Sequence, residues 1–102
     1  MKVFTQSVNF KVDGDLVNFI QKKVGGLDKF HDKIVDAEVF LKVQKTSDKE
    51  NKFTEIKINI PGNELIVKKM NKTFEEGVSL GVESLKRQLK RSKEKKRVSL
   101  VL

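Results

Sequence analysis

The stretch FTEIKINIPGNELIVKKM, residues 53–70, decides the fold because it contains two strands and the turn between them. From Thr54 to Ile60, a β-branched residue recurs at every second position and alternates with charged or amide side chains, which indicates a strand with one buried face. Pro61-Gly62 presets a tight turn, because proline fixes φ and glycine tolerates positive φ. Leu65 to Met70 completes the second strand of a predicted antiparallel hairpin.

The segment before this hairpin adds a third strand. Residues 34–45 contain apolar residues that alternate with polar ones, and this pattern predicts a half-buried strand. Residues 46–51, TSDKEN, have the polar composition of a hairpin loop. Residues 34–70 therefore form a three-stranded meander. Its first strand, residues 34–45, turns these apolar side chains to the core: Ala37, Val39, Leu41 and Val43.

The N-terminal part predicts a further strand and a first helix. Residues 2–10 alternate, which places Phe4, Val8 and Phe10 on one side of a strand. Asp13 or Asp15 can cap the helix that follows, although Gly25-Gly26 interrupts its apolar pattern at a cost of about 1 kcal/mol per glycine relative to alanine. We expect a bent or locally loose helix with this apolar stripe: Leu16, Val17, Ile20, Val24 and Leu27, with Phe19 and Phe30 on one margin.

A second, long helix begins after Thr73, where Thr73-Phe74-Glu75-Glu76 forms a capping box. Gly77 and Gly81 lie four residues apart on it, which predicts a close packing contact. By Lys96 a basic residue falls on the apolar stripe, so we expect the helix to have left the core there. The apolar stripe at helical spacing is Phe74, Val78, Val82, Leu85 and Leu89. Lys86, Lys90, Lys93 and Arg97 flank this stripe, and Arg87 and Arg91 lie farther round toward solvent.

The predicted fold class is α+β, with the order βαβββα. Two amphipathic helices pack on one face of a four-stranded, mainly antiparallel sheet whose other face is polar, and the result is a two-layer sandwich. A chain of 102 residues has room for one core. We expect a single domain over residues 1–95 and a short C-terminal tail over residues 96–102.

The composition excludes several kinds of chemistry. There is no cysteine and only one histidine, His31, so the sequence offers no thiolate, no metal-binding cluster and no His-based catalytic set. We expect His31 to interact with the last carbonyls of the first helix. The prediction is a protein without enzyme activity, cofactor, metal or small-molecule substrate. With no apolar leader or membrane span in sight, we expect it to be soluble and cytoplasmic.

The charge is concentrated in one place. Lys and Arg number 22 and Asp and Glu 14, which gives a net charge of +8. Residues 86–97 contain eight basic residues and one glutamate, so this run alone contributes +7. Such a patch indicates a polyanionic partner, and arginine in particular binds phosphate in a bidentate way. Because the run contains no aromatic residue, the shape and phosphates of A-form RNA fit better than stacked bases.

Three segments carry a resemblance to a known family. FIQKKVGGLDKF (residues 19–30), INIPGNEL (58–65) and TFEEGVSLGVESLKRQLKRSKEK (73–95) resemble the ribosome hibernation-promoting factors, also called ribosome-associated translation inhibitors. The resemblance covers nearly the whole chain. It implies a βαβββα fold related in shape to double-stranded RNA-binding domains.

The resemblance also implies a function and a partner. Members bind the small ribosomal subunit and its ribosomal RNA near the decoding centre, block the mRNA and tRNA sites and inhibit translation in stationary phase or stress. We expect a monomer off the ribosome, with no membrane partner. The resemblance places RNA-binding roles on these residues: Lys22, Lys23, Lys29, Lys86, Arg87, Lys90, Arg91 and Lys93.

The chain departs from the family pattern at three points. Many relatives carry lysine at the position of Gly26, and an aromatic residue is common near the position of Ser92. The family's long form has an additional C-terminal dimerisation domain that pairs ribosomes. If Leu102 is the natural terminus, the chain resembles the short form.

Two other interpretations of the basic run remain. The first is a general double-stranded RNA-binding module without preference for the ribosome. The second is a module for membrane surfaces or acidic proteins, which would use the basic helix and the tail VSLVL, residues 98–102. The apolar stripe of the helix is better explained by the sheet it must cover, which weakens the second interpretation.

Overall fold

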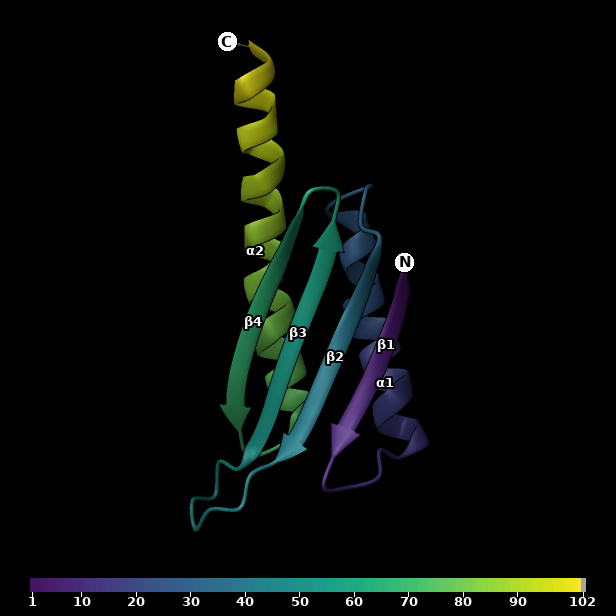
Figure 1. Cartoon of the computed structure of the whole chain (residues 1–102), viewed down its shortest axis with the longest axis vertical. Helices are drawn as coiled ribbons and strands as arrows, with labels where there is room; N and C mark the ends of the chain where they lie inside the picture. Colours follow the sequence, from purple (N-terminus) through teal and green to yellow (C-terminus); the bar gives the residue numbers. More distant parts are fainter. Residues whose placement is uncertain (102) are drawn as a thin grey trace.

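The computed structural model describes the backbone of residues 1–101 and the side chains of residues 1–92. Its four strands lie in sequence order in one sheet (Figure 1). The order of elements confirms the predicted βαβββα arrangement. The elements are β1 (Lys2–Val8), α1 (Gly14–Gly25), the 3-10 helix η1 (Gly26–Lys29), β2 (Asp36–Val43), β3 (Lys52–Ile60), β4 (Asn63–Asn71) and α2 (Phe74–Val101).

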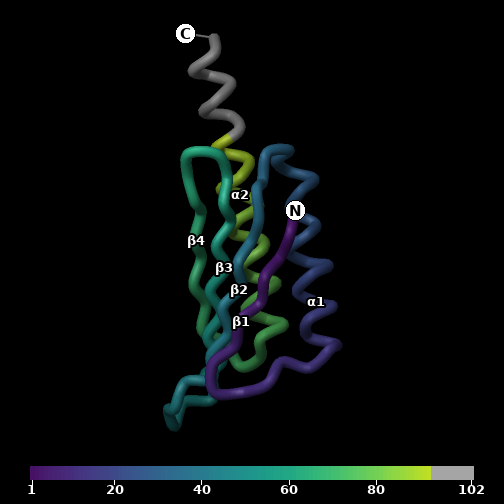
Figure 2. Tube along the Cα trace, turned by 45° about the vertical axis from the view of Figure 1, so that its right-hand side comes forward, coloured from purple at the N-terminus to yellow at the C-terminus, as the bar shows by residue number. Residues whose placement is uncertain are grey.

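The sheet is mainly antiparallel, as predicted. β1 pairs with β2 in parallel, whereas β2 with β3 and β3 with β4 are antiparallel. Both helices cover the same face of the sheet (Figure 2). α1 contacts β1, α2 contacts β3 and β4, and the two helices contact each other. The molecule is therefore the expected two-layer α+β sandwich.

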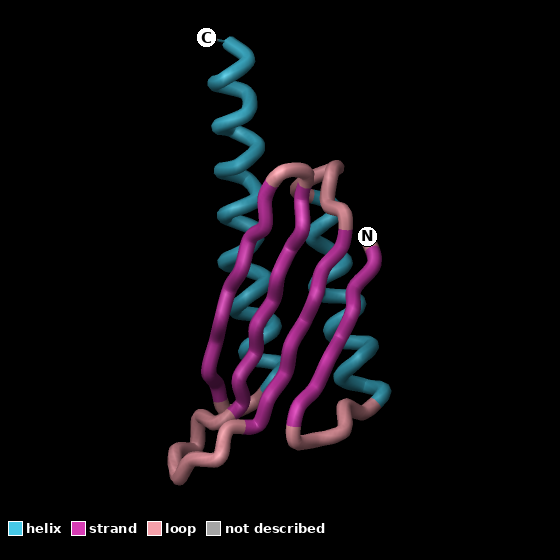
Figure 3. The backbone as a smooth tube through the Cα atoms, viewed as in Figure 1, coloured by secondary structure: helices cyan, strands magenta, loops and turns pink. Residues whose placement is uncertain are grey.

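The strand directions decide how the two helices run. β4 has the direction of β2, because two antiparallel pairings separate them, and β2 has the direction of β1. α1 follows β1 and α2 follows β4, and each returns across the sheet. The helices therefore run in the same direction, and α1 ends near the end of the sheet that carries the β3–β4 turn (Figures 1 and 3).

The first helix changes from an α-helix to a 3-10 helix at its two adjacent glycines, Gly25 and Gly26. Asp13 caps α1, and its carboxylate accepts a hydrogen bond from the amide of Leu16 at 2.8 Å. The α-helix stops at Gly25 and continues as η1 to Lys29. The locally irregular helix predicted from Gly25-Gly26 is thus an α-to-3-10 transition. Leu27, on η1, is still fully buried in the core.

The second helix lies unusually close to the sheet. A Cβ atom on Gly77 would approach Thr54 Oγ1 of β3 to 2.6 Å, and one on Gly81 would approach Ile56 Cδ1 to 2.9 Å. Glycine at these two positions is what permits the close contact predicted from the sequence. Downstream, Leu85 and Leu89 are fully buried. The helix begins as expected, with Thr73 Oγ1 accepting from the amide of Glu76 at 3.1 Å.

The prediction for the first strand is wrong in its face and its end. β1 stops at Val8, and Phe4 lies on the outer face with 54% of its surface exposed. Asn9 adopts a left-handed backbone conformation with φ 71°, which interrupts the alternation. Phe10 consequently turns back into the core, where its ring stacks on Phe74 with centroids 4.7 Å apart. Sequence alternation could not reveal this reversal.

Two further expectations need correction. His31 is buried, but its Nδ1 accepts a hydrogen bond from the amide of Lys33 at 3.1 Å, so the ring contacts an amide instead of the helix carbonyls. The outer face of the sheet is also less polar than predicted. Apolar side chains stand among its charges, and the exposed ones are Phe4, Ile66 and Met70, with Phe40 and Phe53 in an edge-to-face pair.

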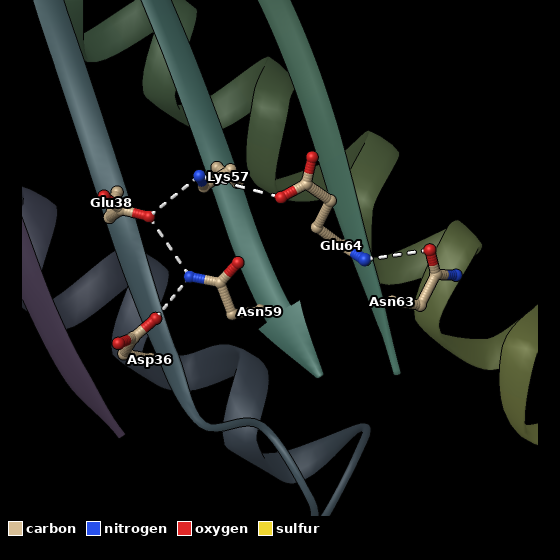
Figure 4. Close-up of polar contacts among 6 residues, drawn as sticks. All are labelled: Asp36, Glu38, Lys57, Asn59, Asn63 and Glu64. Carbon is tan, nitrogen blue, oxygen red and sulfur yellow. Dashed lines mark hydrogen bonds and ion pairs between the residues drawn. The ribbon is translucent and has the colours of Figure 1, made fainter. Parts of the chain in front are cut away.

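Several charges of the outer face are paired with one another (Figure 4). Lys57 Nζ lies 3.2 Å from Glu38 Oε2 and 3.6 Å from Glu64 Oε2, while Asn59 Nδ2 donates to Glu38 Oε2 at 3.1 Å. The hydrogen bond from Asn59 and the ammonium of Lys57 lower the pKa of Glu38 below its ordinary value of 4.5. The same contact with Glu38, and then the charge of Glu64, raise the pKa of Lys57 above 10.5.

The glycine contact can be tested by adding one methyl group. We expect Gly77→Ala to lower the free energy of unfolding relative to Gly25→Ala by about 1–3 kcal/mol, because the new Cβ overpacks the helix–sheet contact. Gly25 is the matched control. It is helical, and a Cβ there meets nothing within 4 Å, so both variants receive a similar gain in helix propensity. Urea unfolding followed by circular dichroism measures the difference, and equal stabilities would contradict the predicted contact.

The paired carboxylate should leave a signature at low pH. Because the folded-state pKa of Glu38 is lowered, its contribution to stability is present above the unfolded-state pKa and is lost as the pH falls through the folded-state pKa. We therefore expect Glu38→Gln to flatten the fall of the unfolding free energy below about pH 4.5. Glu50→Gln, at an exposed loop residue without an ion pair in the described part of the chain, is the control. Identical pH profiles of the unfolding free energy for Glu38→Gln and the parent protein would contradict a stabilising role of the Glu38 carboxylate.

Candidate nucleic-acid interface

The predicted RNA-binding residues lie on the C-terminal half of α1, on η1 and on the middle of α2. Lys22 and Lys23 occupy the last turn of α1, where the helix dipole favours cations. All of the residues with described side chains are exposed except Lys86, which is half-buried. The side chain of Lys93 lies outside the described residues. We call the remaining seven the basic surface: Lys22, Lys23, Lys29, Lys86, Arg87, Lys90 and Arg91.

The common direction of the helices brings the two halves of this surface to one region. Phe30 directly follows η1, and its ring lies under two lysines of α2. The ammonium of Lys86 is 4.8 Å from the ring centroid and that of Lys90 is 5.3 Å away. Both distances are within the range of a cation–π interaction. The end of the first helical segment thus touches the basic run of the second.

Arg91 lies on the other flank of α2, beside β4. It lines an open hollow of about 200 Å³ together with Asn63, Leu65, Gln88 and Ser92. Because Leu85 and Leu89 anchor α2 between these two flanks, its basic side chains project on both sides of a fixed axis. Lys86 and Lys90 face the end of η1, and Arg91 lies toward the β3–β4 turn.

Within the described residues, no ion pair holds the cations of the basic surface. Within residues 1–92, the side-chain ion pairs are Lys57 with Glu38 and Glu64, and Lys68 with Glu55. All of them join strands of the sheet, and none involves a residue of the basic surface. An incoming phosphate would therefore displace water from these cations without first breaking an ion pair.

Another open hollow, of about 390 Å³, lies on the outer face and is lined in part by Phe4, Phe40, Glu38 and Glu55. Its carboxylates make it a poor site for phosphate. No group of three metal-ligating side chains occurs among the described residues. Across the same residues, no helix combines the length and apolar character that crossing a membrane would require.

Sequence reasoning missed the contribution of Phe30 and of the neutral residues beside Arg91. The sequence pattern puts Phe30 on the margin of a helical stripe, and only the packing of α2 against the end of η1 shows that two lysine ammonium groups lie over its ring. The i, i+4 spacing of Lys86 and Lys90 was the available signal, since such residues share one helix face. The aromatic partner comes from a segment more than fifty residues away.

Comparisons with known proteins agree with this arrangement. The family model described as Sigma 54 modulation protein / S30EA ribosomal protein matches residues 3–97. Among solved structures, the N-terminal domain of Protein Y from Thermus thermophilus is similar, with a TM-score of 0.76, 22% identity, and coverage of 89% of this chain and 98% of that domain.

A second solved structure is similar over nearly its whole length. It is a ribosomal subunit interface protein from Coxiella burnetii, with a TM-score of 0.80, 17% identity, and coverage of 92% of this chain and 99% of that protein. At these identities the two structures establish the shared fold. No curated protein sequence matches the chain significantly. The family model therefore carries the evidence for relationship.

Proposed function

Because the chain belongs to the Sigma 54 modulation protein / S30EA ribosomal protein family, the ribosome hibernation-promoting factors, we propose that it binds the small ribosomal subunit and inhibits translation. In this proposal it lies near the decoding centre, contacts ribosomal RNA and blocks the mRNA and tRNA sites in stationary phase or stress. The observation that carries the proposal is the gathering of cations from both helical segments into one basic surface, with no ion pair to any of them among the described residues.

The chemistry of the basic surface suits ribosomal RNA. Lysine and arginine side chains neutralise phosphates and release counterions, which supplies salt-dependent affinity. The side chains of α2 stand on a helix fixed to the sheet, so they can match the spacing of phosphates along folded RNA. Recognition by shape and phosphate contacts is how proteins commonly bind A-form RNA.

The proposal also covers the setting of the protein. A ribosome-binding inhibitor works in the cytoplasm, needs no catalytic residue and acts by occupying a site. We propose that it is a monomer when it is off the ribosome. A general double-stranded RNA-binding module would use the same cations, and only the family relationship favours the ribosome over it. Competition between small subunits and arbitrary duplex RNA separates the two functions.

The role of the exposed arginines gives a direct test. We expect Arg87→Glu with Arg91→Glu to weaken binding to isolated small subunits at least about tenfold, because two charge-assisted phosphate contacts are lost. The slope of log affinity against log salt should also fall by roughly 1.5, since each phosphate contact contributes roughly 0.7–0.9. Sedimentation of the protein with small subunits at several salt concentrations measures both quantities.

The matched control reverses two charges elsewhere. Lys45 and Lys49 are exposed near the β2–β3 loop, which lies at the end of the sheet opposite the β3–β4 turn (Figure 1). Lys45→Glu with Lys49→Glu changes the net charge by the same amount, so it separates a local contact from a general electrostatic effect. If both double variants lower the salt slope equally, Arg87 and Arg91 do not contact phosphate. If the parent protein does not sediment with small subunits at low salt, the proposed function is wrong.

A further inference from the structure

We propose that Phe30, Lys86 and Lys90 form a composite phosphate-binding site, in which the phenyl ring positions the two ammonium groups for the RNA backbone. This inference rests on the proposed function, because it assigns a specific contact within the basic surface. Phe30 is the new element: a neutral residue outside the basic run that acts through the two lysines.

The geometry gives the ring two cations at once. The centroid of Phe30 lies 4.8 Å from Lys86 Nζ and 5.3 Å from Lys90 Nζ. Lys86 and Lys90 are one helical turn apart, so their like charges repel each other. The negative face of an aromatic ring attracts a cation, and this attraction holds both side chains near Phe30 despite their repulsion.

The ring itself is held firmly. Phe30 is half-buried and packs against the hydrophobic core, directly after η1, whose Leu27 is fully buried. On the other side, Leu85 and Leu89 fix α2 to the sheet. The two lysines are thus ordered between rigid elements, whereas exposed lysines usually retain their rotamer freedom.

The two lysines of this cluster lack an anionic partner among the described residues. None of the ion pairs in the described part of the chain includes Lys86 or Lys90. An ammonium group has three N–H donors. The ring contacts only the side of the ammonium group that faces it, so donors on the other side remain available. A phosphate oxygen can accept from the remaining donors of both lysines while the ring keeps its place beneath them.

The ring improves phosphate binding by ordering the lysines in advance. Immobilising a long side chain costs free energy on association. Here the two lysine side chains are already ordered in the folded protein, so binding loses less side-chain entropy. The same arrangement limits what can bind, because the ammonium groups lie over the ring that a base would need for stacking. The site therefore takes the backbone of RNA in preference to an unstacked base.

Replacing the ring tests this role. We expect Phe30→Leu, which keeps an apolar side chain, to weaken binding to small subunits roughly two- to five-fold, the equivalent of one exposed cation–π interaction. Phe30→Tyr should restore binding. Phe19→Leu is the matched control, because Phe19 is also half-buried but has a single lysine, Lys23, at 5.9 Å from its ring. A smaller loss is expected there.

A double-mutant cycle separates positioning from general structural damage. In a Lys86→Gln, Lys90→Gln background, Phe30→Leu should no longer weaken binding, since the groups that the ring positions are gone. In an Arg87→Gln background, Phe30→Leu should keep its full effect. Urea unfolding of each variant reports any loss of stability. An effect of Phe30→Leu that persists without the two lysines would overturn the inference and leave the proposed function standing.

A second measurement does not depend on the ribosome. In NMR spectra of the parent protein, a short A-form RNA duplex should shift the side-chain signals of Lys86 and Lys90, and Phe30→Leu should reduce these shifts. If small subunits fail to bind but the duplex produces these shifts, the phosphate site is supported and the proposed function is wrong. If the duplex shifts Arg87 and Arg91 but leaves Lys86 and Lys90 unchanged, the phosphate site is wrong.

Discussion

The position of α2 depends on its contact with the sheet at Gly77 and Gly81. With no side chain at either residue, the helix backbone approaches Thr54 and Ile56 of β3 to a distance that a Cβ atom would prevent. This contact fixes the rotation of the helix about its axis. Leu85 and Leu89 then fall on the core, and the basic residues around them are turned to the two flanks. The binding surface is in this sense a consequence of helix–sheet packing.

The basic surface also depends on the topology of the sheet. Because β1 and β4 run in the same direction, both helices return across the sheet the same way, and the end of the first helical segment meets the basic run of the second at Phe30. An antiparallel pair of helices would place the end of α1 beside the start of α2, which carries Glu75 and Glu76. The parallel β1–β2 pairing thus places the end of the first helical segment beside the basic part of α2 and away from its acidic start.

Much of the fold could be predicted because most of the sequence repeats its local pattern. On the strands from Ala37 to Val67, a buried or half-buried apolar or β-branched residue recurs at every second position, so their core faces follow directly from the sequence. Prediction failed for β1, where one left-handed residue, Asn9, reverses the pattern. The basic residues of the candidate site were also visible in the sequence, but Phe30 was not recognised as their partner. Periodicity assigns a side chain to one face of its own element, and it does not say which residue of another element stands opposite.

The separate placement of paired and unpaired charges has a consequence for how the protein approaches a partner. On the outer face of the sheet, Lys57 and Lys68 are matched by carboxylates from neighbouring strands, whereas no helix cation with a described side chain takes part in an ion pair. The positive charge of the described residues that is not in ion pairs is therefore concentrated in the basic surface of the helical layer. The field of a polyanion exerts a torque on this uneven charge distribution and turns the helices toward the partner before contact, so a larger share of diffusional encounters begins in a productive orientation.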